Sequence, residues 1–443
     1  QPYRERYRPQ FHFSARNGWL NDPNGLVFYK GVYHLFFQHN PYGTMWGNMT
    51  WGHAVSRDLM HWNQLDNALL PDEMGTMYSG SAVVDWDNTA GLQSGDEKTI
   101  VALYTAAGGT SAESKGQPFT QCLAYSTDGG MTLAKYASNP VLAHITSENR
   151  DPKVTWYAPG RFWVMALYLD GSTFRLFKSV KLTAWEPFQT IEMPGCSECP
   201  DFFPLAVQDE PGDIKWVLTA ANGMYLVGTF DGSQFIPDSH HPLQVDFGAN
   251  FYAVQTYSDA PDGRRIQIGW MNGGRFPDML FNQQMSIPCE LSLVRTGDGL
   301  CLTRNPVHAI VAIYETESVW GNRVLSSAPE VLSTHDLLDI ELHCVVSNAS
   351  KVTITIRGEP LTYDEDSTTL NLLGKSAPLP LNEGRLKLRV LVDRTSIEVF
   401  AGDGQVSMTS SFTPDVANTQ TTLSGSDVTV STLTVHELRS TWE

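Results

Sequence analysis

A chain of 443 residues, of which 42% are apolar and only 18% are charged, is globular and long enough to form two domains. Its formal net charge of −18 argues against general binding to nucleic acid or to anionic membranes, because both need a basic face. No run of about 18 apolar residues occurs, so the sequence predicts no membrane span.

The first informative stretch is residues 19–25, Trp-Leu-Asn-Asp-Pro-Asn-Gly, which precede an apolar run at 26–29. Pro23 restricts Asp22 to extended geometry. Asn24 and Gly25 predict a tight turn, because both tolerate a positive φ. Asp22 is therefore a candidate catalytic carboxylate on a stiff backbone. The alternative is an ordinary turn acid that caps its own backbone.

Short β-branched and aromatic runs separated by turn residues then recur along the chain, with almost no helical periodicity. The clearest lie at 31–37, 80–84, 99–104, 162–169, 215–219, 224–229 and 265–270. A weak repeat of Ser and Asp before an aromatic or apolar residue returns at intervals near the length of a propeller blade, about 40–50 residues. The sequence therefore predicts an all-β chain, with a five-bladed β-propeller over residues 1–305.

The pattern of apolar and polar residues changes after the predicted propeller. Residues 306–316 form a predicted linker with one or two helical turns, and 317–443 alternate apolar with polar residues in a predicted β-sandwich. The strands expected there include 341–346, 351–357, 385–393 and 396–400. Within 392–400 the charges occupy alternate positions and predict a solvated face, so no functional role is expected for Glu398.

Six cysteines give no pattern that demands disulfides or zinc. Cys196 and Cys199 have C-x-x-C spacing, but no second pair at similar spacing accompanies them. Free thiols are expected, with no metal and no cofactor.

Three acidic residues share an unusual local context. Asp22, Asp151 and Glu198 are each followed by proline at one or two residues, and they recur near the blade interval. Tyr78-Ser79 and Tyr252 continue the same spacing. Corresponding positions on successive blades meet at the central channel of a propeller, so these residues are expected to share one pocket. Carboxylates packed together acquire different pKa values, which is what glycoside hydrolysis requires.

At this point the sequence resembles glycoside hydrolase family 32, which holds invertases, exo-inulinases and levanases. The resemblance rests on residues 19–25, 51–62, 78–82, 150–152, 198–200 and 268–271 and extends over nearly the whole chain. It implies a retaining double displacement on terminal β-fructofuranosyl units of fructans or sucrose. Asp22 matches the nucleophile, Glu198 the acid/base and Asp151 a transition-state stabiliser. The resemblance also implies a fructose subsite, which would include Trp19, Asn21, Gln38, Trp46, Asn48, Tyr78, Ser79, Arg150, Tyr252 and Trp270.

Two positions depart from the family pattern. Tyr78 stands where members often have phenylalanine, a change that should be tolerated. Cys289 stands where members often have arginine; if that arginine braces the pocket rim, its loss would alter the leaving-group subsite.

Alternative functions stay open. A fructosyltransferase would use the same three acids and favour a sugar acceptor over water. A carbohydrate-binding propeller without catalysis, and an inverting arabinan- or xylan-cleaving enzyme, would share the fold. The chain begins at Gln1 without a leader, which is typical of a mature secreted or periplasmic product. Nothing in the sequence indicates an oligomeric state.

Overall fold

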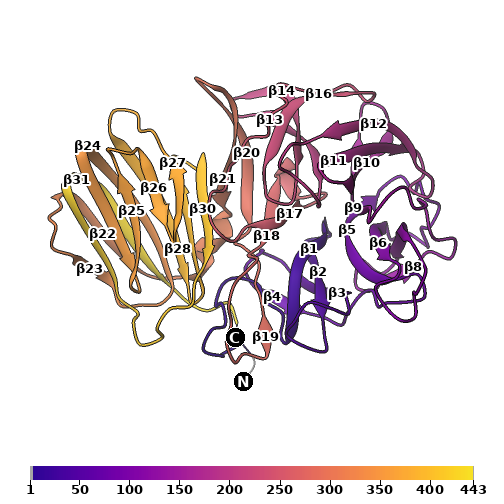
Figure 1. The fold of residues 1–443 in the computed structure, drawn as a ribbon, viewed down its shortest axis with the longest axis horizontal. Coiled ribbons are helices and arrows are strands. Elements are labelled where there is room, and N and C mark those ends of the chain that lie inside the picture. Colours follow the sequence, from indigo (N-terminus) through magenta and orange to yellow (C-terminus); the bar gives the residue numbers. More distant parts are fainter. Residues whose placement is uncertain (1–2, 443) are drawn as a thin grey trace.

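The computed structural model describes residues 3–442, which form a β-propeller with a β-sandwich beside it (Figure 1). This confirms the predicted all-β fold. The first three groups of propeller strands form separate antiparallel sheets. These sheets follow one another in chain order around a common centre (Figure 1). Within residues 3–442 no helix has the length and apolar character needed to cross a membrane.

The propeller strands fall into five groups of four antiparallel strands, which is consistent with five blades. They are β1 (Gly18–Tyr29), β2 (Val32–Asn40), β3 (Thr50–Ser56) and β4 (Trp62–Gln64); β5 (Thr76–Asp85), β6 (Thr99–Ala107), β7 (Phe119–Ser126) and β8 (Ala134–Lys135); β9 (Arg150–Tyr157), β10 (Phe162–Asp170), β11 (Thr173–Ser179) and β12 (Glu186–Glu192); β13 (Asp201–Val207), β14 (Glu210–Thr219), β15 (Tyr225–Phe230) and β16 (Phe235–Pro237); and β17 (Tyr252–Thr256), β18 (Ile266–Trp270), β20 (Cys289–Thr296) and β21 (Gly299–Pro306). A single parallel pair, Val207 with Leu293, joins the last two groups, and the short strand β19 (Phe281–Asn282) runs parallel to β1.

The strands β1, β5, β9, β13 and β17 line the centre of the propeller, and each begins its own group. These strands are largely buried because both of their faces are covered, as β5 shows with nine of its ten residues buried. Adjacent sheets pack their apolar faces together, so the strand beginnings from all five groups are brought to one end of the central channel.

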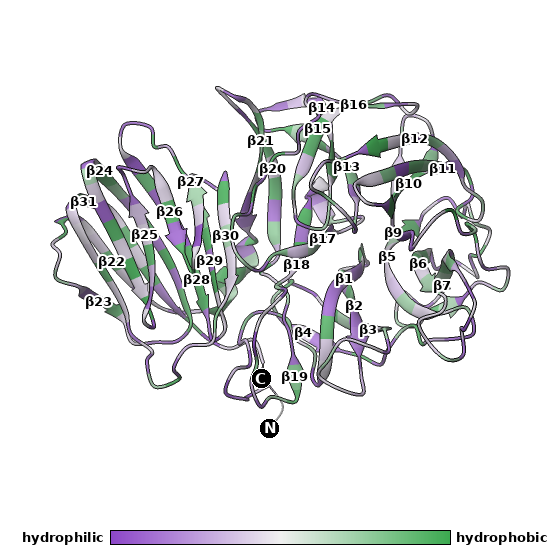
Figure 2. Cartoon of the chain, viewed as in Figure 1, coloured by the Kyte–Doolittle hydropathy of each residue, from purple (hydrophilic) through white to green (hydrophobic). Residues whose placement is uncertain are grey.

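The sandwich follows a 3-10 helix at His308–Ile313, which agrees with the helical turns expected in the linker. Its strands are β22 (Tyr314–Val324), β23 (Glu330–Ser333), β24 (Leu338–Ile356), β25 (Glu359–Asp364), β26 (Thr369–Leu372), β27 (Lys375–Pro378), β28 (Arg385–Asp393), β29 (Ser396–Ala401), β30 (Val406–Ser411) and β31 (Thr421–Leu438). Hydrophobic and hydrophilic residues alternate along β24 and β31, as one buried and one solvated face requires (Figure 2). The two strands expected at 341–346 and 351–357 are one long strand, β24, whose pairing with β31 shifts between Val346 and Lys351.

The prediction of a solvated face within residues 392–400 is wrong. Asp393 and Glu398 are both fully buried, in the hairpin of β28 and β29 where the sandwich meets the propeller. His12 lies between them: its Nδ1 is 2.8 Å from Asp393 Oδ2, and its Nε2 bonds Glu398 Oε1. Strand alternation places charges on one face, but it does not reveal that a second domain covers that face.

The buried pairing of His12 predicts a loss of stability at alkaline pH. Burial by itself would lower the pKa of His12, but Glu398 and Asp393 outweigh burial and raise this pKa to about 9. Because the folded pKa lies above the unfolded value of 6.5, the pairing stabilises the fold fully below pH 6.5 and is lost as the pH rises through about 9. We expect His12→Gln to lower the free energy of unfolding by about 3–5 kcal/mol near neutral pH, because it leaves buried carboxylates unpaired.

Thermal unfolding between pH 6 and pH 10 tests this prediction. The melting temperature of the wild type should fall towards that of His12→Gln as the pH rises. His61→Gln is the matched control, because His61 pairs with Asp58 at the surface, where its side chain is 44% exposed. Parallel curves for wild type and His12→Gln across this range would contradict the assignment.

Candidate active site

Asp22 lies within β1 at the open end of the central channel. The expected turn at Asn24 and Gly25 is absent, because the chain continues as a strand through both residues, with irregular pairing to β2 between Asn24 and Val27. Gly25 has a φ of 56°, and a Cβ there would lie 2.6 Å from the ring of Phe36. The bulge keeps the carboxylate of Asp22 turned into the channel within a paired sheet.

Asp22 makes side-chain hydrogen bonds, not the backbone cap of an ordinary turn acid. Ser79 Oγ donates to its Oδ2 at 2.5 Å, and Asn21 Nδ2 donates to its Oδ1 at 3.1 Å. These donors come from β5 and β1, so two neighbouring strands orient one carboxylate.

Asp151 and Glu198 reach the same place from the next two groups of strands. Asp151 is the second residue of β9, and Glu198 lies in the loop before β13. Both have a left-handed backbone, with φ of 68° and 59°, and so does Cys199 with 41°. Non-glycine residues rarely adopt this region and concentrate at functional sites when they do. The amide of Cys199 donates to Asp151 Oδ2 at 2.9 Å, which joins the two acidic segments directly.

Glu198 is oriented by two polar partners. Tyr252 Oη donates to Glu198 Oε1 at 2.8 Å, and Arg150 Nη2 lies 3.4 Å from Glu198 Oε2. The guanidinium of Arg150 also stacks over Tyr168, which fixes its position beside the acids.

The electrostatics of the acids follow from burial and crowding. Burial, together with the charges of Asp22 and Glu198, raises the pKa of Asp151 to about 7, although the charge of Arg150 lowers it. Burial likewise raises the pKa of Asp22, against the hydrogen bonds from Ser79 and Asn21. The pKa of Cys199 is raised well above its usual value, so this thiol stays protonated. Asp22 and Asp151 are therefore harder to ionise than ordinary aspartates, because they are buried and crowded together.

Replacing Asp151 by asparagine should stabilise the protein while it lowers activity. The folded pKa of Asp151 is about 7, above its ordinary value of 3.8, so the fold loses stability as the pH rises from 3.8 to about 7, and the loss is complete above 7. An asparagine oxygen can still accept the amide of Cys199. We expect the melting temperature of Asp151→Asn to exceed that of the wild type by a few degrees at pH 8 and by less at pH 5. A melting temperature that falls at pH 8 would show that the carboxylate stabilises the fold.

The three acids line one cavity of about 260 Å³. The other lining residues are Asn21, Gln38, Trp46, Tyr78, Ser79, Glu148, Arg150, Tyr252 and Trp270. Eleven of the thirteen candidate residues therefore meet in one place. Their roles in catalysis and binding remain proposals, which are argued below.

Two candidate residues do not line this cavity. Trp19 stands behind it, where its Nε1 donates to Asn21 Oδ1 at 2.9 Å and its ring packs against Trp270. Asn48 is exposed and donates to Asn40 Oδ1 at 3.3 Å. Neither Trp19 nor Asn48 belongs to the lining of this cavity, and their place in a sugar subsite remains a prediction.

Glu148 lines the cavity, although the sequence did not predict it as a site residue. Its side chain is 71% exposed, and its carbonyl accepts from Arg150 Nη1 at 2.6 Å. It lies two residues before Arg150 in a loop, and no motif distinguishes it from other surface acids.

Cys289 lies away from the cavity rim. It is fully buried at the start of β20, where Arg304 Nη2 approaches its Sγ at 3.7 Å. The departure at this position therefore gives no reason to expect an altered leaving-group subsite.

All six cysteines are free thiols. Within residues 3–442, the group of His, Cys, Asp and Glu atoms that could hold a metal ion is one atom each from Asp22, Asp151 and Cys199, all within 4.8 Å of one another. The carboxylate oxygens there already accept hydrogen bonds from Ser79 and the Cys199 amide. That the protein needs no metal remains a prediction.

A β-propeller that carries two carboxylates with raised pKa values, an arginine and aromatic side chains at one end of its channel defines the class of a glycosidase. Comparison with known proteins agrees. Residues 12–304 match the model of the glycosyl hydrolases family 32 N-terminal domain, and residues 315–437 match the family 32 C-terminal model.

Relatives and solved structures cover the whole chain. Levanase from Bacillus subtilis is 37% identical over 492 aligned positions, which span 99% of this chain and 72% of that protein. Extracellular exo-inulinase from Aspergillus awamori is 30% identical, over 99% of this chain and 96% of that protein. The crystal structure of the A. awamori exo-inulinase superposes with a TM-score of 0.90, at 29% identity and over 100% of both chains. The fructofuranosidase from Schwanniomyces occidentalis, complexed with fructosylnystose, superposes with a TM-score of 0.88, at 26% identity and over 99% of both chains. The protein belongs to glycosyl hydrolase family 32.

Proposed function

We propose that the protein releases terminal β-fructofuranosyl units from fructans or sucrose by a retaining double displacement. The observation that carries this proposal is the position of Asp22. Its carboxylate is held by Ser79 and Asn21 at the bottom of a cavity that also contains Glu198. Relatives named levanase and exo-inulinase support fructans as substrates.

In the first step, Asp22 attacks the anomeric carbon while Glu198 gives its proton to the leaving oxygen. The bond to the leaving group breaks as the carboxylate ester to Asp22 forms. In the second step, Glu198 takes a proton from water, and the resulting hydroxide displaces Asp22 from the anomeric carbon. Configuration is inverted twice and is therefore retained.

The neighbouring residues prepare these steps. Ser79 and Asn21 aim the nucleophile, and Tyr252 with Arg150 positions the carboxyl of Glu198. Asp151 would accept hydrogen bonds from sugar hydroxyls and stabilise positive charge that develops at the anomeric carbon. The rings of Trp46, Tyr78 and Trp270 supply apolar surface for the sugar faces.

Incubation with sucrose, inulin and levan in parallel, with products resolved over time, tests the proposal. We expect free fructose as the first product, and NMR of the first turnovers should show the retained configuration. Longer oligosaccharides as first products would assign a fructosyltransferase. Sugar binding without any release would assign a carbohydrate-binding propeller, and an inverted first product would assign an inverting enzyme.

Two further features belong to this proposal. The relative described as an extracellular exo-inulinase supports secretion of this protein as well. We also propose domain boundaries at 1–305 for the propeller, 306–316 for the linker and 317–443 for the sandwich. The end of β21 at Pro306 supports the first boundary, whereas β22 already begins at Tyr314, within the proposed linker.

A further inference from the structure

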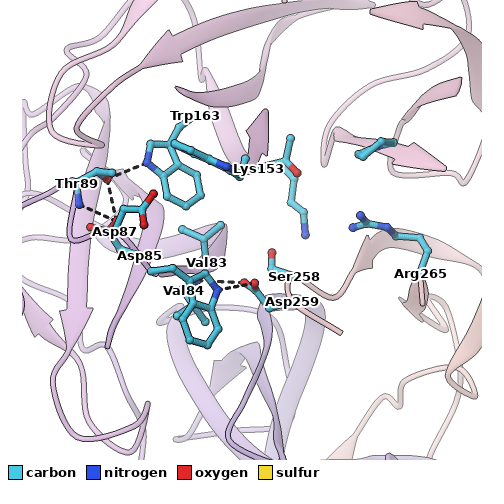
Figure 3. A pocket seen from close by; sticks show the side chains of 14 residues that line it. Val83, Val84, Asp85, Asp87, Thr89, Lys153, Trp163, Ser258, Asp259 and Arg265 are labelled. Atoms are coloured by element: carbon cyan, nitrogen blue, oxygen red, sulfur yellow. Dashed lines mark hydrogen bonds between the residues drawn. The ribbon is translucent and has the colours of Figure 1, made fainter. Parts of the chain in front are cut away.

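Figure 3 shows a second cavity, which lies away from the active site along the innermost strands. The acids of the active site lie at or before the beginnings of the innermost strands, whereas this cavity is lined by residues farther along the same strands. Val83 and Val84 lie near the end of β5, Lys153 lies within β9, and Ser258 follows β17. Its volume is about 200 Å³, enough for one small organic molecule.

Hydrogen bonds across the channel separate the two cavities. Gln255 Nε2 donates to the carbonyl of Gly80 at 3.0 Å, and Ser81 Oγ donates to the carbonyl of Pro152 at 2.8 Å. These bonds link β17, β5 and β9 between the two ends. A ligand in the second cavity would therefore occupy its own site and not an extension of the active site.

Two cationic side chains point into this cavity: Lys153 from β9, and Arg265, which directly precedes β18. Figure 3 shows their charged ends facing one another. The side chain of Lys153 is only 3% exposed, and its Nζ donates to the carbonyl of Thr256 at 2.5 Å. Arg265 Nη1 donates hydrogen bonds to Thr256 Oγ1 and to the carbonyl of Tyr257. Its Nε is buried and has no hydrogen-bond partner among residues 3–442.

Acids lie close to this pair: Asp201 is beside Lys153, and Asp85, Asp87 and Asp259 line the cavity. Asp201 lies 3.8 Å from Lys153 Nζ, yet burial together with the charge of Arg265 lowers the pKa of Lys153 to about 8. Asp85 is fully buried and already accepts from Thr89 and from the amide of Ala90.

The carboxylate of Asp259, at the mouth of the cavity, also accepts hydrogen bonds from the protein. It accepts from Trp86 Nε1 at 2.9 Å and from the amide of Val84 at 3.3 Å. The Nε–H of Arg265 is therefore the donor without an acceptor among residues 3–442, and a buried donor without an acceptor is costly.

The opposite wall contains apolar side chains beside Asp85, Asp87 and Thr89. Trp163, Val83 and Val84 face the two cations across the cavity (Figure 3). Trp86, which is 50% exposed, continues this apolar surface to the mouth. A ligand that fills the space must offer acceptors at one end and a flat apolar body at the other.

We propose that this cavity binds a small carboxylic acid in its ionised form, with the carboxylate between Lys153 and Arg265 and an apolar body against Val83 and the tryptophans. A carboxylate presents two acceptor oxygens, which suits a guanidinium and an ammonium that converge from different strands. The apolar side chains in the wall disfavour a bare inorganic anion.

Calorimetric titration of the full chain with benzoate tests the proposal. Benzyl alcohol serves as a neutral ligand of similar shape, and phosphate serves as an anion that lacks an apolar ring. We expect benzoate to bind at least about tenfold more tightly than either, because a charge-assisted hydrogen bond contributes about that factor. Arg265→Met should weaken benzoate binding by about tenfold or more for the same reason. Trp86→Ala, at the exposed mouth, should weaken binding without threatening the fold, and it keeps the test decisive if Arg265→Met fails to fold.

Arg385→Met is the matched control, because Arg385 is 72% exposed on the sandwich. Equal binding of benzoate and benzyl alcohol, or unchanged affinity in both Arg265→Met and Trp86→Ala, would overturn the proposal. Phosphate binding as tightly as benzoate would replace it with a site for inorganic anions. The titrations are repeated in Asp22→Asn, where binding should persist after hydrolysis is lost, so this site and the proposed glycosidase activity can fail separately.

Discussion

Replacing Asp22 by asparagine should reduce the rate of fructose release by about 10⁴-fold or more, because the covalent step loses its nucleophile. The amide keeps the shape of the carboxylate and can still accept from Ser79. Burial raises the pKa of Asp22, so the carboxylate is costly to ionise in the fold. The melting temperature of Asp22→Asn should therefore equal or exceed that of the wild type.

Steady-state rates on inulin and sucrose, together with thermal unfolding, check this expectation. Asp96→Asn is the matched control, since Asp96 is an exposed carboxylate outside the cavity, and it should leave both quantities unchanged. If Asp22→Asn unfolds at markedly lower temperature, Asp22 is a structural acid. If it retains full activity, another group is the nucleophile.

Replacing Glu198 by glutamine should have an effect that depends on the leaving group. For sucrose or inulin the leaving oxygen needs a proton, and loss of a positioned general acid should cost about 10²–10⁴-fold. An aryl β-fructofuranoside with an acidic phenol needs no such help, so its bond cleavage should be slowed far less. Glutamine keeps a donor and an acceptor in the place where Tyr252 and Arg150 hold the carboxyl.

Azide provides the second half of this experiment. In the proposed mechanism Glu198 also deprotonates water, and azide attacks the anomeric carbon without a base. Azide should therefore accelerate turnover of the aryl substrate by Glu198→Gln and form a fructosyl azide, with little effect on the wild type. Glu186→Gln, at an exposed position on β12, is the control. An equal loss on activated and natural substrates, without rescue by azide, would remove Glu198 from the acid/base role.

The backbone and the charged groups of this pocket show that its assembly lowers the stability of the fold. Asp151, Glu198 and Cys199 have left-handed φ angles, and burial raises the pKa values of Asp22 and Asp151. Both features destabilise the fold locally and prepare the site for catalysis. The prediction that Asp151→Asn stabilises the protein at alkaline pH follows from the same balance.

Local sequence was a reliable guide where neighbouring residues decide the outcome. Apolar runs predicted the propeller strands, and alternation predicted the sandwich strands, because both patterns report how many faces of a strand are covered. The spacing of Asp22, Asp151 and Glu198 predicted a shared pocket, since successive blades repeat the same position at the channel. The family resemblance added most of the surrounding subsite residues.

Tertiary contacts decided the rest. Asn24 and Gly25 have the residue types of a turn, but pairing with β2 and the nearby ring of Phe36 hold them in a bulged strand. Glu398 alternates like a surface residue, yet the propeller covers it and His12 pairs with it. Glu148 enters the cavity from a loop that no pattern marks, and Lys153 meets Arg265 from strands distant in sequence. The sequence by itself determined the type of each element and the identity of the acids, because these depend on local periodicity and motif. Only the tertiary structure decided which charges are buried and which meet, because burial and pairing depend on surfaces that come together from distant parts of the chain.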